Sequence, residues 1–494
     1  MVMTVTDPGR HRGRNPALRR LAVAALSVAT CLGGLSFSGL LLSAEGTSFP
    51  QPVPEAKCGP GARPETDIQG RVPQRDYDNG RVQRGYQCNT RMVSHQGTHG
   101  GFKTLRYTDR TGRTCAFYDS TRLFPADALF QARSGLGVVV LDMTDPAEPR
   151  RTANLATPAM LSPHESLLVE PRRGLLAAVV GNPMTNVGIL EIYDVRADCR
   201  RPVLLSSTSE PILGHESGWS PDGRTFYASS TGGQTLAAID VSNPREPKRI
   251  FEQFGVNYHG LRFSRDGRTM YAANIGNDLS GGTFPGEGLR IIDVSEIQDR
   301  LPDPQITVLS DLVWREGSIP QVSQPFRRGK RDYLLQVDEF AKFGLGDIAD
   351  APVGAARIID VTDPRHPEVI SHLRLQVHQP AGRRRSINDP GAGSPVGGYT
   401  GHYCSAPYQD DPKVVACSMI ASGLRIFDIR DLRNPKEVGY FNRPTEDIVP
   451  LRTGANAMSQ PAWDVKRRSV WYTDGTSGFY VVKLTNGIGQ LLAR

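Results

Sequence analysis

The sequence lacks the signature motifs of several common catalytic and nucleotide-binding folds. It contains no G-x-S-x-G nucleophile elbow, no G-x-x-x-x-G-K-[ST] phosphate loop and no G-x-G-x-x-G between a strand and a helix. These absences argue against serine hydrolases of the elbow type and against a nucleotide cofactor. Long segments with a 3.6-residue hydrophobic period are also missing after about residue 50, so we expect a mostly β protein.

Cysteine is scarce and never occurs as C-x-x-C, which excludes the usual zinc-knuckle and redox motifs. Beyond the first 44 residues six cysteines remain, an even number that permits disulfides in an exported chain. Cys404 and Cys417 lie on two predicted strands joined by a turn at residues 409–412, so we expect a cross-strand disulfide between them. Six cysteines allow fifteen pairings, and the sequence leaves the other bonds open.

Residues 1–44 have the composition of a signal peptide or a membrane anchor. Five arginines precede an uncharged apolar run from Leu21 to Leu42, and the small residues Ser43 and Ala44 follow it. The run is long for a cleaved signal, so an uncleaved anchor is the alternative and the one membrane contact that we expect. Either way the body of the chain is expected to be secreted or displayed at the cell surface.

The chain carries no basic domain, although its formal net charge is +7. Five arginines minus Asp7 place +4 of this charge in residues 1–44, which leaves +3 on the rest of the chain. The arginine-rich stretches at 327–331 and 383–385 lie among glycine, proline and serine, as in solvated loops. We therefore expect no nucleic-acid partner.

Internal repeats are the strongest signal in the sequence. The unit GVVVLDMTDPAEP, residues 137–149, returns as LAAIDVSNPREP, LRIIDVSEIQD, ARIIDVTDPRHP and LRIFDIRDLRNP. Each copy is an apolar strand that ends in aspartate at a turn, and a hairpin precedes it. Seven such units occur 44 to 78 residues apart, which predicts an all-β, seven-bladed propeller of four-stranded blades over residues 87–494.

The ends of the propeller can also be predicted. The last unit has three clear strands, and a spare strand at Cys88–His95 precedes the first hairpin. Pairing this spare strand with the last blade would close the ring and cover two open edges. Residues 45–86 are rich in proline, glycine and arginine, and we expect an irregular linker there.

The repeat units resemble the LVIVD repeat of bacterial secreted and surface β-propeller proteins, over roughly residues 87–485. The resemblance implies the propeller fold. Members of this family are chemically diverse, so the resemblance implies no particular reaction.

Four of the ten histidines fall at one repeat position, the start of the first strand of a blade. In blade order this position reads Thr104, His164, His215, His259, Gln324, His402 and Gln460. Because the first strands line the central channel of a propeller, the histidines are expected to form a ring around it. Imidazoles favour a transition metal, with copper or iron preferred and zinc the alternative. The competing hypothesis is that the histidines are structural residues copied with the repeat.

Other residues near the ring receive secondary roles. Further channel candidates are Gln324, Gln460, Glu165 and Glu216, with a supporting role favoured for the two glutamates. Glu165 and Glu216 each follow a histidine, and on a strand they would point to the opposite face and support the ligands from behind. The ring also resembles the four-histidine arrangement of carotenoid cleavage oxygenases and selenium-binding proteins, which implies a metal held by His164, His215, His259 and His402.

Three functions therefore remain open. The leading one is a monomeric exported propeller whose metal binds or oxidises a small substrate, beneath long loops at residues 276–288, 339–354 and 380–399. The alternative is a metal-free scaffold that binds a protein or glycan partner at this loop-rich face. A sugar hydrolase or lyase would need paired carboxylates, for which Asp338 or Glu339 with Asp474 are the candidates, although capping of loops is their expected role.

Overall fold

The computed structural model describes residues 49–120, 137–181, 188–231, 233–276, 287–340, 352–392, 398–445 and 454–493. The predicted signal or anchor at residues 1–44 lies outside this part of the chain. Within it, no helix is both long and apolar enough to cross a membrane.

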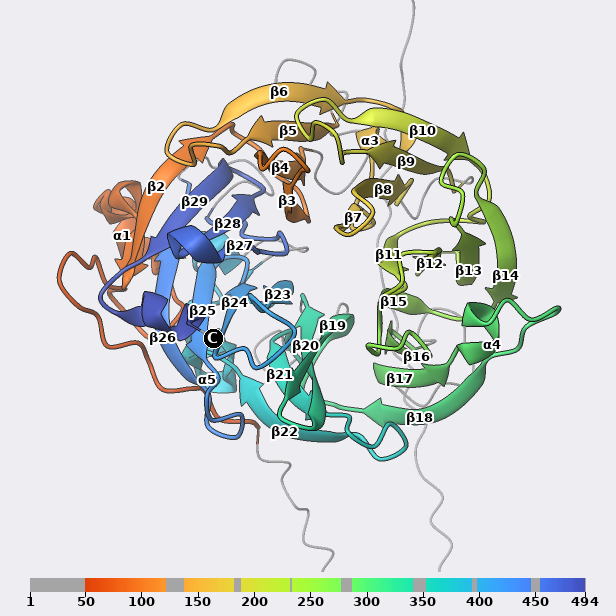
Figure 1. The fold of residues 1–494 in the computed structure, drawn as a ribbon. Helices are drawn as coiled ribbons and strands as arrows, with labels where there is room; N and C mark the ends of the chain where they lie inside the picture. Colours follow the sequence, from red (N-terminus) through yellow and green to blue (C-terminus); the bar gives the residue numbers. More distant parts are fainter. Residues whose placement is uncertain are drawn as a thin grey trace, which may run out of the picture. The chain divides into compact units, whose positions relative to one another are not determined.

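Residues 49–494 form a seven-bladed β-propeller of antiparallel blades, as the repeats predicted (Figure 1). Blade 1 consists of β3 (Thr104–Thr108), β4 (Thr114–Asp119), β5 (Val138–Asp142) and β6 (Arg150–Leu155). Blade 2 consists of β7 (Leu168–Glu170), β8 (Leu175–Val179), β9 (Leu190–Asp194) and β10 (Val203–Thr208). Blade 3 consists of β11 (Glu216–Trp219), β12 (Thr225–Ser230), β13 (Thr235–Asp240) and β14 (Lys248–Phe254). Blades 4 and 5 consist of β15 (Tyr258–Phe263), β16 (Thr269–Asn274), β17 (Gly288–Asp293) and β18 (Thr307–Val313); and β19 (Ile319–Arg328), β20 (Arg331–Glu339), β21 (Ala356–Asp360) and β22 (Glu368–Leu373).

Blades 6 and 7 complete the ring. Blade 6 contains β23 (Tyr403–Ser405), β24 (Val414–Ser418), β25 (Leu424–Asp428) and β26 (Lys436–Asn442), and blade 7 contains β27 (Ala462–Asp464), β28 (Ser469–Asp474), β29 (Gly478–Leu484) and β2 (Thr90–Gln96). The first strand of each blade lies innermost in Figure 1. Short helices occur in the connections: α1 (Gln74–Asp78), α3 (Pro158–Leu161), α4 (Ser295–Gln298) and α5 (Pro380–Ser386).

The repeated strands form the buried layers between blades. Every residue of β8, β12 and β24 is buried, whereas the outer strand β14 is largely exposed. In blades 1 to 6 the aspartate that ends the third strand accepts a hydrogen bond from the backbone N–H two residues further on, as Asp142 does from Thr144 and Asp428 from Arg430. The repeated aspartates are therefore turn-stabilising residues, as the sequence indicated.

The ring closes through the N-terminal strand, as predicted. Strand β2 pairs antiparallel with β29, so a strand that precedes the first blade in the chain completes the last blade. The preceding strand β1 (Tyr86–Cys88) instead adds a fifth strand to blade 6 through β26. Asn89, which lies between the two strands, adopts a left-handed conformation with φ 53°, and this bend directs the chain from one blade to the next.

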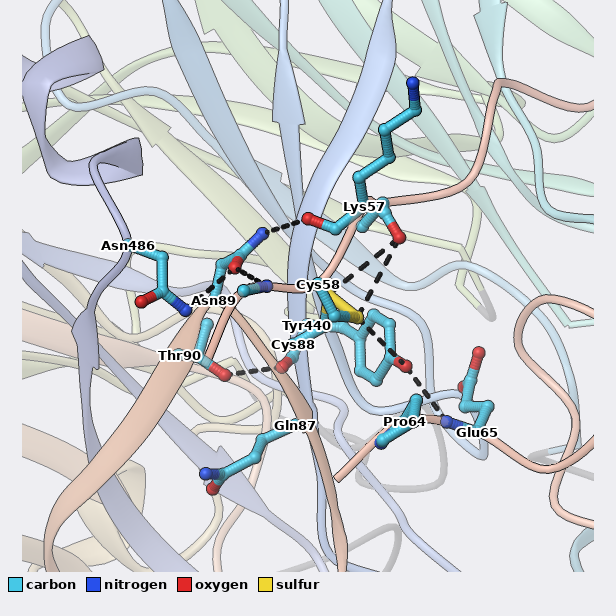
Figure 2. The surroundings of a disulfide bond; sticks show 12 residues. Lys57, Cys58, Pro64, Glu65, Gln87, Cys88, Asn89, Thr90, Tyr440 and Asn486 are labelled. Carbon is cyan, nitrogen blue, oxygen red and sulfur yellow. Dashed lines mark hydrogen bonds between the residues drawn. A yellow bond between two sulfur atoms is a disulfide. The ribbon is translucent and has the colours of Figure 1, made fainter. Parts of the chain in front are cut away.

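A disulfide and an asparagine hold this junction (Figure 2). Cys58 is bonded to Cys88. The Asn89 amide donates to the carbonyls of Lys57 and Val438, and its oxygen accepts from the Gly59 N–H. The N-terminal segment is thus tied to the seam between blades 6 and 7.

Residues 49–85 contain only α1 and one turn of 3-10 helix, Arg81–Arg84, as regular structure. They are nevertheless packed onto blades 5 and 6. The buried Arg425 of β25 binds both Glu65 of this segment and Glu437 of β26, and Arg71 makes two hydrogen bonds to Asp389. Buried charges of this kind need such partners, so the segment contributes to the stability of these blades.

All six cysteines beyond residue 48 are paired. The predicted cross-strand bond between Cys404 and Cys417 is present, on directly opposed residues of β23 and β24. The third bond joins Cys115 of β4 to Cys199, between β9 and β10, and so links blade 1 to blade 2. Three disulfides indicate an oxidising compartment.

Candidate metal centre

The four histidines of the repeat position converge at one end of the first strands. His259 is the second residue of β15, whereas His215 and His402 immediately precede β11 and β23, and His164 lies in a turn before β7. The ring centroids of His164 and His215 are 4.5 Å apart, and those of His215 and His259 are 4.8 Å apart. His259 and His402 are fully buried, while His164 and His215 each keep 8% of their surface exposed.

Glu165 occupies the centre of the cluster. Its Oε2 lies 2.7 Å from the Nε2 of His259 and 3.3 Å from the Nε2 of His215. The two Nε2 atoms are themselves 3.0 Å apart, so the three donor atoms form a small triangle. On the other side, the Oε1 of Glu165 lies 3.4 Å from the Nε2 of His402.

The expectation that Glu165 would point away from the histidines was wrong, because His164 and Glu165 do not lie on a strand. His164 has a φ of 49°, and the Ser166 N–H bonds the Pro163 carbonyl across a tight turn. The two-residue alternation of a strand does not apply in such a turn. Both side chains therefore belong to one cluster, with donor atoms within 4.8 Å of each other and of a donor atom of His215.

Glu339 is a second carboxylate of the site. It ends β20, and its Oε2 lies 2.9 Å from the Nε2 of His402, while its Oε1 lies 3.8 Å from the Nδ1 of His259. Donor atoms of Glu165, Glu339 and His402 all lie within 4.8 Å of one another. A loop-capping role was expected for Glu339, and the only sequence signal for its position here is that an acidic residue ends a second strand.

Gln321 connects the two carboxylates. Its side-chain amide donates to the Oε1 of Glu165 at 2.6 Å and to the Oε2 of Glu339 at 3.2 Å. Its carbonyl oxygen is buried and has no hydrogen-bond partner among the described residues. An acceptor left free in a buried cluster is available for a further ligand.

Backbone carbonyls fix the orientation of two imidazoles. The Nδ1 of His259 donates to the Pro320 carbonyl at 3.0 Å, and the Nδ1 of His402 donates to the Met458 carbonyl. A proton on Nδ1 leaves the Nε2 of each ring as the lone-pair nitrogen directed into the cluster. This arrangement is typical of histidines that bind metals.

The same groups can also form a metal-free ion-pair network. Burial lowers the pKa of His259, but the carboxylate of Glu165 outweighs it and raises the pKa to about 9. For His402 burial is likewise outweighed by hydrogen bonds to Glu165 and Glu339, and its pKa is also raised to about 9. Burial and the neighbouring His215 hold the pKa of His164 well below its usual value.

In blades 5 and 7, the residues that lie at the position of these histidines are not the ones that the aligned repeats predicted. Because His259 and His402 bond the carbonyls of Pro320 and Met458, the equivalent residues are those that follow, Gln321 and Ser459. Gln324 lies three residues further along β19, a strand that is longer than expected and is irregular near Gln321. Its assignment to the ring was therefore wrong.

Two further members of the predicted column lie outside the histidine layer. The side chain of Gln460 is 3.5 Å from Arg262, and the Thr104 hydroxyl bonds those of Ser459 and Thr473. In blade 1 the ring of Phe102 lies beside the histidines. Its centroid is 4.5 Å from the ring centroid of His164 and 5.4 Å from that of His402.

Glu216 belongs to a second buried cluster next to the histidines. It accepts two hydrogen bonds from Lys103, at 2.9 and 3.1 Å, and one from the Tyr403 hydroxyl at 2.5 Å. The Lys103 ammonium also lies 3.9 Å from the centre of the Tyr403 ring, and the edge of that ring contacts His402. With these partners Glu216 is an ion-pair residue, not a metal ligand.

The carboxylates considered for sugar chemistry are engaged elsewhere. Asp338 makes two hydrogen bonds to Arg357 and one to Trp314, and Asp474 caps the loop through the N–H groups of Asn456 and Thr476. These contacts match the expected capping role of Asp474 and give Asp338 a structural role.

Much of the predicted loop-rich rim lies outside the described residues, namely 277–286, 341–351 and 393–397. Within the third loop, Pro380–Ser386 forms α5 where a loop was expected. Pro380 begins this helix, a position at which proline's missing N–H costs nothing, and three arginines occupy its last turn.

Asp119 supports the segment that carries Phe102 and Lys103, and it supplies a test by pH. Its Oδ2 accepts the N–H groups of both residues, and burial raises its pKa to about 8 although these bonds oppose the shift. A raised pKa means that the stability of the fold declines as pH rises from about 4 to about 8. We expect Asp119→Asn to remove this decline.

We compare the free energy of unfolding of Asp119→Asn with that of the wild type at pH 5 and at pH 9. The advantage of the variant should be larger at pH 9 by at least ~1.4 kcal/mol, which corresponds to one pKa unit. Denaturant unfolding of both proteins at the two pH values measures it. A gain that is equal at both values would contradict the assignment.

The fold and the site together define a seven-bladed β-propeller with a buried cluster of four histidines and two glutamates at one end of its first strands. No family model matches the chain, and no curated protein matches it.

Several solved structures show a limited similarity to this chain. Hydrazine synthase of Kuenenia stuttgartiensis matches with 14% identity and a TM-score of 0.48, over 80% of this chain and 97% of that chain. The Cps50 (Swd1) β-propeller domain of Myceliophteria thermophila matches with 10% identity and a TM-score of 0.45, over 80% and 98%. Likenesses at this level carry no argument about function.

Proposed function

We propose that the protein is an exported β-propeller of the LVIVD-repeat kind that holds a transition metal at the mouth of its channel. The ligands are His164, His215, His259 and His402, joined by Glu165. The metal binds or oxidises a small substrate.

The triangle of donor atoms carries the proposal. Ligands bonded at 2.0–2.1 Å to one metal ion lie about 2.9 Å apart at right angles and about 3.4 Å apart at tetrahedral angles. The Nε2 atoms of His215 and His259 and the Oε2 of Glu165 are separated by 3.0, 2.7 and 3.3 Å. Three donors at these separations form one face of a metal coordination shell.

The types of donor atom restrict which metal ions suit the site. Imidazole nitrogens with a carboxylate oxygen suit copper, iron or zinc better than calcium or magnesium, which prefer oxygen ligands alone. A bound ion of this kind supplies Lewis acidity and, for copper or iron, one-electron chemistry. The carbonyls of Pro320 and Met458 keep the Nε2 atoms of His259 and His402 directed inward.

The least buried residues of the cluster indicate the side from which a substrate would approach. His164 and His215 retain some solvent exposure, whereas His259, His402 and Glu165 each expose 1% or less of their surface. We therefore assign substrate approach to the side of His164 and His215. The ring of Phe102 packs beside the rings of His164 and His402, with centroid separations of 4.5 and 5.4 Å.

A metal-free scaffold is the second candidate. The raised pKa of His259 and of His402 favours it, because two imidazolium groups would neutralise Glu165 and Glu339 without an ion. In that case a protein or glycan partner would bind at the loop-rich face, and the cluster would only stabilise the channel.

Elemental analysis of the untagged, exported protein distinguishes the two. We expect at least one copper, iron or zinc ion per chain in the wild type and at least one ion per chain fewer in His259→Ala. The matched control is His366→Ala, because His366 is exposed and bonds only Asp363 among the described residues. Wild-type protein that retains no metal after reconstitution with these ions would overturn the proposal.

A further inference from the structure

Glu165 directs its two oxygens to two different sets of donors. Its Oε2 faces the Nε2 atoms of His215 and His259, whereas its Oε1 faces the Nε2 of His402 and the amide of Gln321. A carboxylate with each oxygen in a separate donor set has the arrangement of a bridge between two cations. We propose that the cluster binds two metal ions bridged by Glu165, an inference that rests on the proposed metal function.

The first ion site consists of His164, His215 and His259 with the Oε2 of Glu165. Donor atoms of His164, Glu165 and His215 lie within 4.8 Å of one another, and His259 completes the triangle described above. This set is rich in nitrogen and lies on the partly exposed side of the cluster. Its ion is the one that substrate reaches.

The second ion site consists of His402, Glu339 and the Oε1 of Glu165. The Nε2 of His402 lies 2.9 Å from the Oε2 of Glu339 and 3.4 Å from the Oε1 of Glu165, separations that again suit ligands of one ion. Two carboxylates and one imidazole form a set rich in oxygen. All three residues keep 5% or less of their surface exposed, so this ion is the deeper one.

Phe102 and Gln321 each lie beside residues of both sites. The ring of Phe102 contacts both His164 and His402, one histidine from each set. The Gln321 amide donates to Glu165 and Glu339 and so holds the two carboxylates of the second site together.

Metal stoichiometry tests this proposal on the full-length chain. After reconstitution with Cu(II) and gel filtration, we expect two ions per chain in the wild type and in His366→Ala, and one in Glu339→Gln and in His215→Ala. Glu339→Gln preserves the shape of the side chain; if it fails to fold by circular dichroism, His402→Gln removes a ligand from the same site.

Spin quantitation by electron paramagnetic resonance provides a second readout. Two bridged Cu(II) ions couple, so the wild-type spin count should fall well below its copper content, whereas in Glu339→Gln the two should agree. One ion in both the wild type and Glu339→Gln would overturn the paired site and leave the proposed function standing. No retained ion in the wild type would overturn both, and two ions that survive Glu339→Gln would place the second ion elsewhere and refute the bridge.

Discussion

Replacement of Lys103 by methionine is expected to lower the free energy of unfolding by about 3–5 kcal/mol. The Lys103 and Glu216 side chains are both fully buried, and the ammonium makes two hydrogen bonds to the carboxylate. Methionine removes the cation and leaves the Glu216 carboxylate in the channel with the Tyr403 hydroxyl and a guanidinium nitrogen of Arg262 3.5 Å away. A buried charge that loses its closest partner destabilises the fold by far more than an exposed pair does.

Replacement of Glu216 should lower the free energy of unfolding by less than replacement of Lys103. Burial lowers the pKa of Lys103 to about 8, against the opposing effect of Glu216, so Lys103 is already close to losing its proton at neutral pH. In Glu216→Gln the lysine can become neutral at modest cost, because its pKa already lies close to neutral pH. We expect Lys103→Met combined with Glu216→Gln to recover most of the stability lost in Lys103→Met alone.

Guanidinium unfolding of the four proteins of this double-mutant cycle measures the coupling. Lys466→Met is the matched control, because Lys466 is exposed in the short helix Val465–Arg467, and its effect should stay within about 0.5 kcal/mol. A Lys103→Met variant as stable as this control would show that the pair contributes nothing. The location gives the test wider interest, since the Tyr403 ring beside this pair also contacts His402.

Loss of the Cys115–Cys199 disulfide is expected to cost about 4–5 kcal/mol in the chain-entropy description of cross-links. The bond joins residues 84 apart in the sequence and connects blade 1 to blade 2. Opening it frees a long segment in the unfolded chain and removes a covalent link between two blades. The expected change is a lower midpoint for the double alanine variant in guanidinium without a reductant.

The Cys404–Cys417 disulfide supplies an internal comparison. It spans only 13 residues and joins two strands that are already paired, so its loss should cost about 3 kcal/mol in the same description. An equal or larger effect for this bond than for Cys115–Cys199 would contradict the entropic explanation. Both double variants keep the other two disulfides, which isolates each contribution.

The fold could be predicted because the sequence repeats it. The apolar strand ending in aspartate, the hairpin before it and the spare N-terminal strand each specify a local structure, and a blade needs neighbours to bury both of its faces. The same local reasoning predicted the Cys404–Cys417 bond, because opposed positions in a hairpin follow from the turn between them. These features depend on residues close together in the chain.

The site was predicted only in part, for a related reason. The four histidines share a repeat position and could be found by alignment. Gln321 was missed because β19 is longer than the other first strands, so Gln324, three residues further on, took its place in an alignment made on the turns. Glu165 was assigned to the wrong face because strand alternation fails in the turn at His164. Glu339 ends a second strand, and nothing in its local sequence places it beside His402, a residue of the next blade.

The sequence by itself determined the architecture, the ring closure and the histidine ring, since each follows from periodic patterns and local turns. The tertiary structure alone decided which carboxylates enter that ring, and that Lys103 meets Glu216 across 113 positions of the chain. The reason is that side chains in the channel meet through the closure of the whole ring. Their distances depend on the twist and stagger of seven blades together, and no local pattern encodes those.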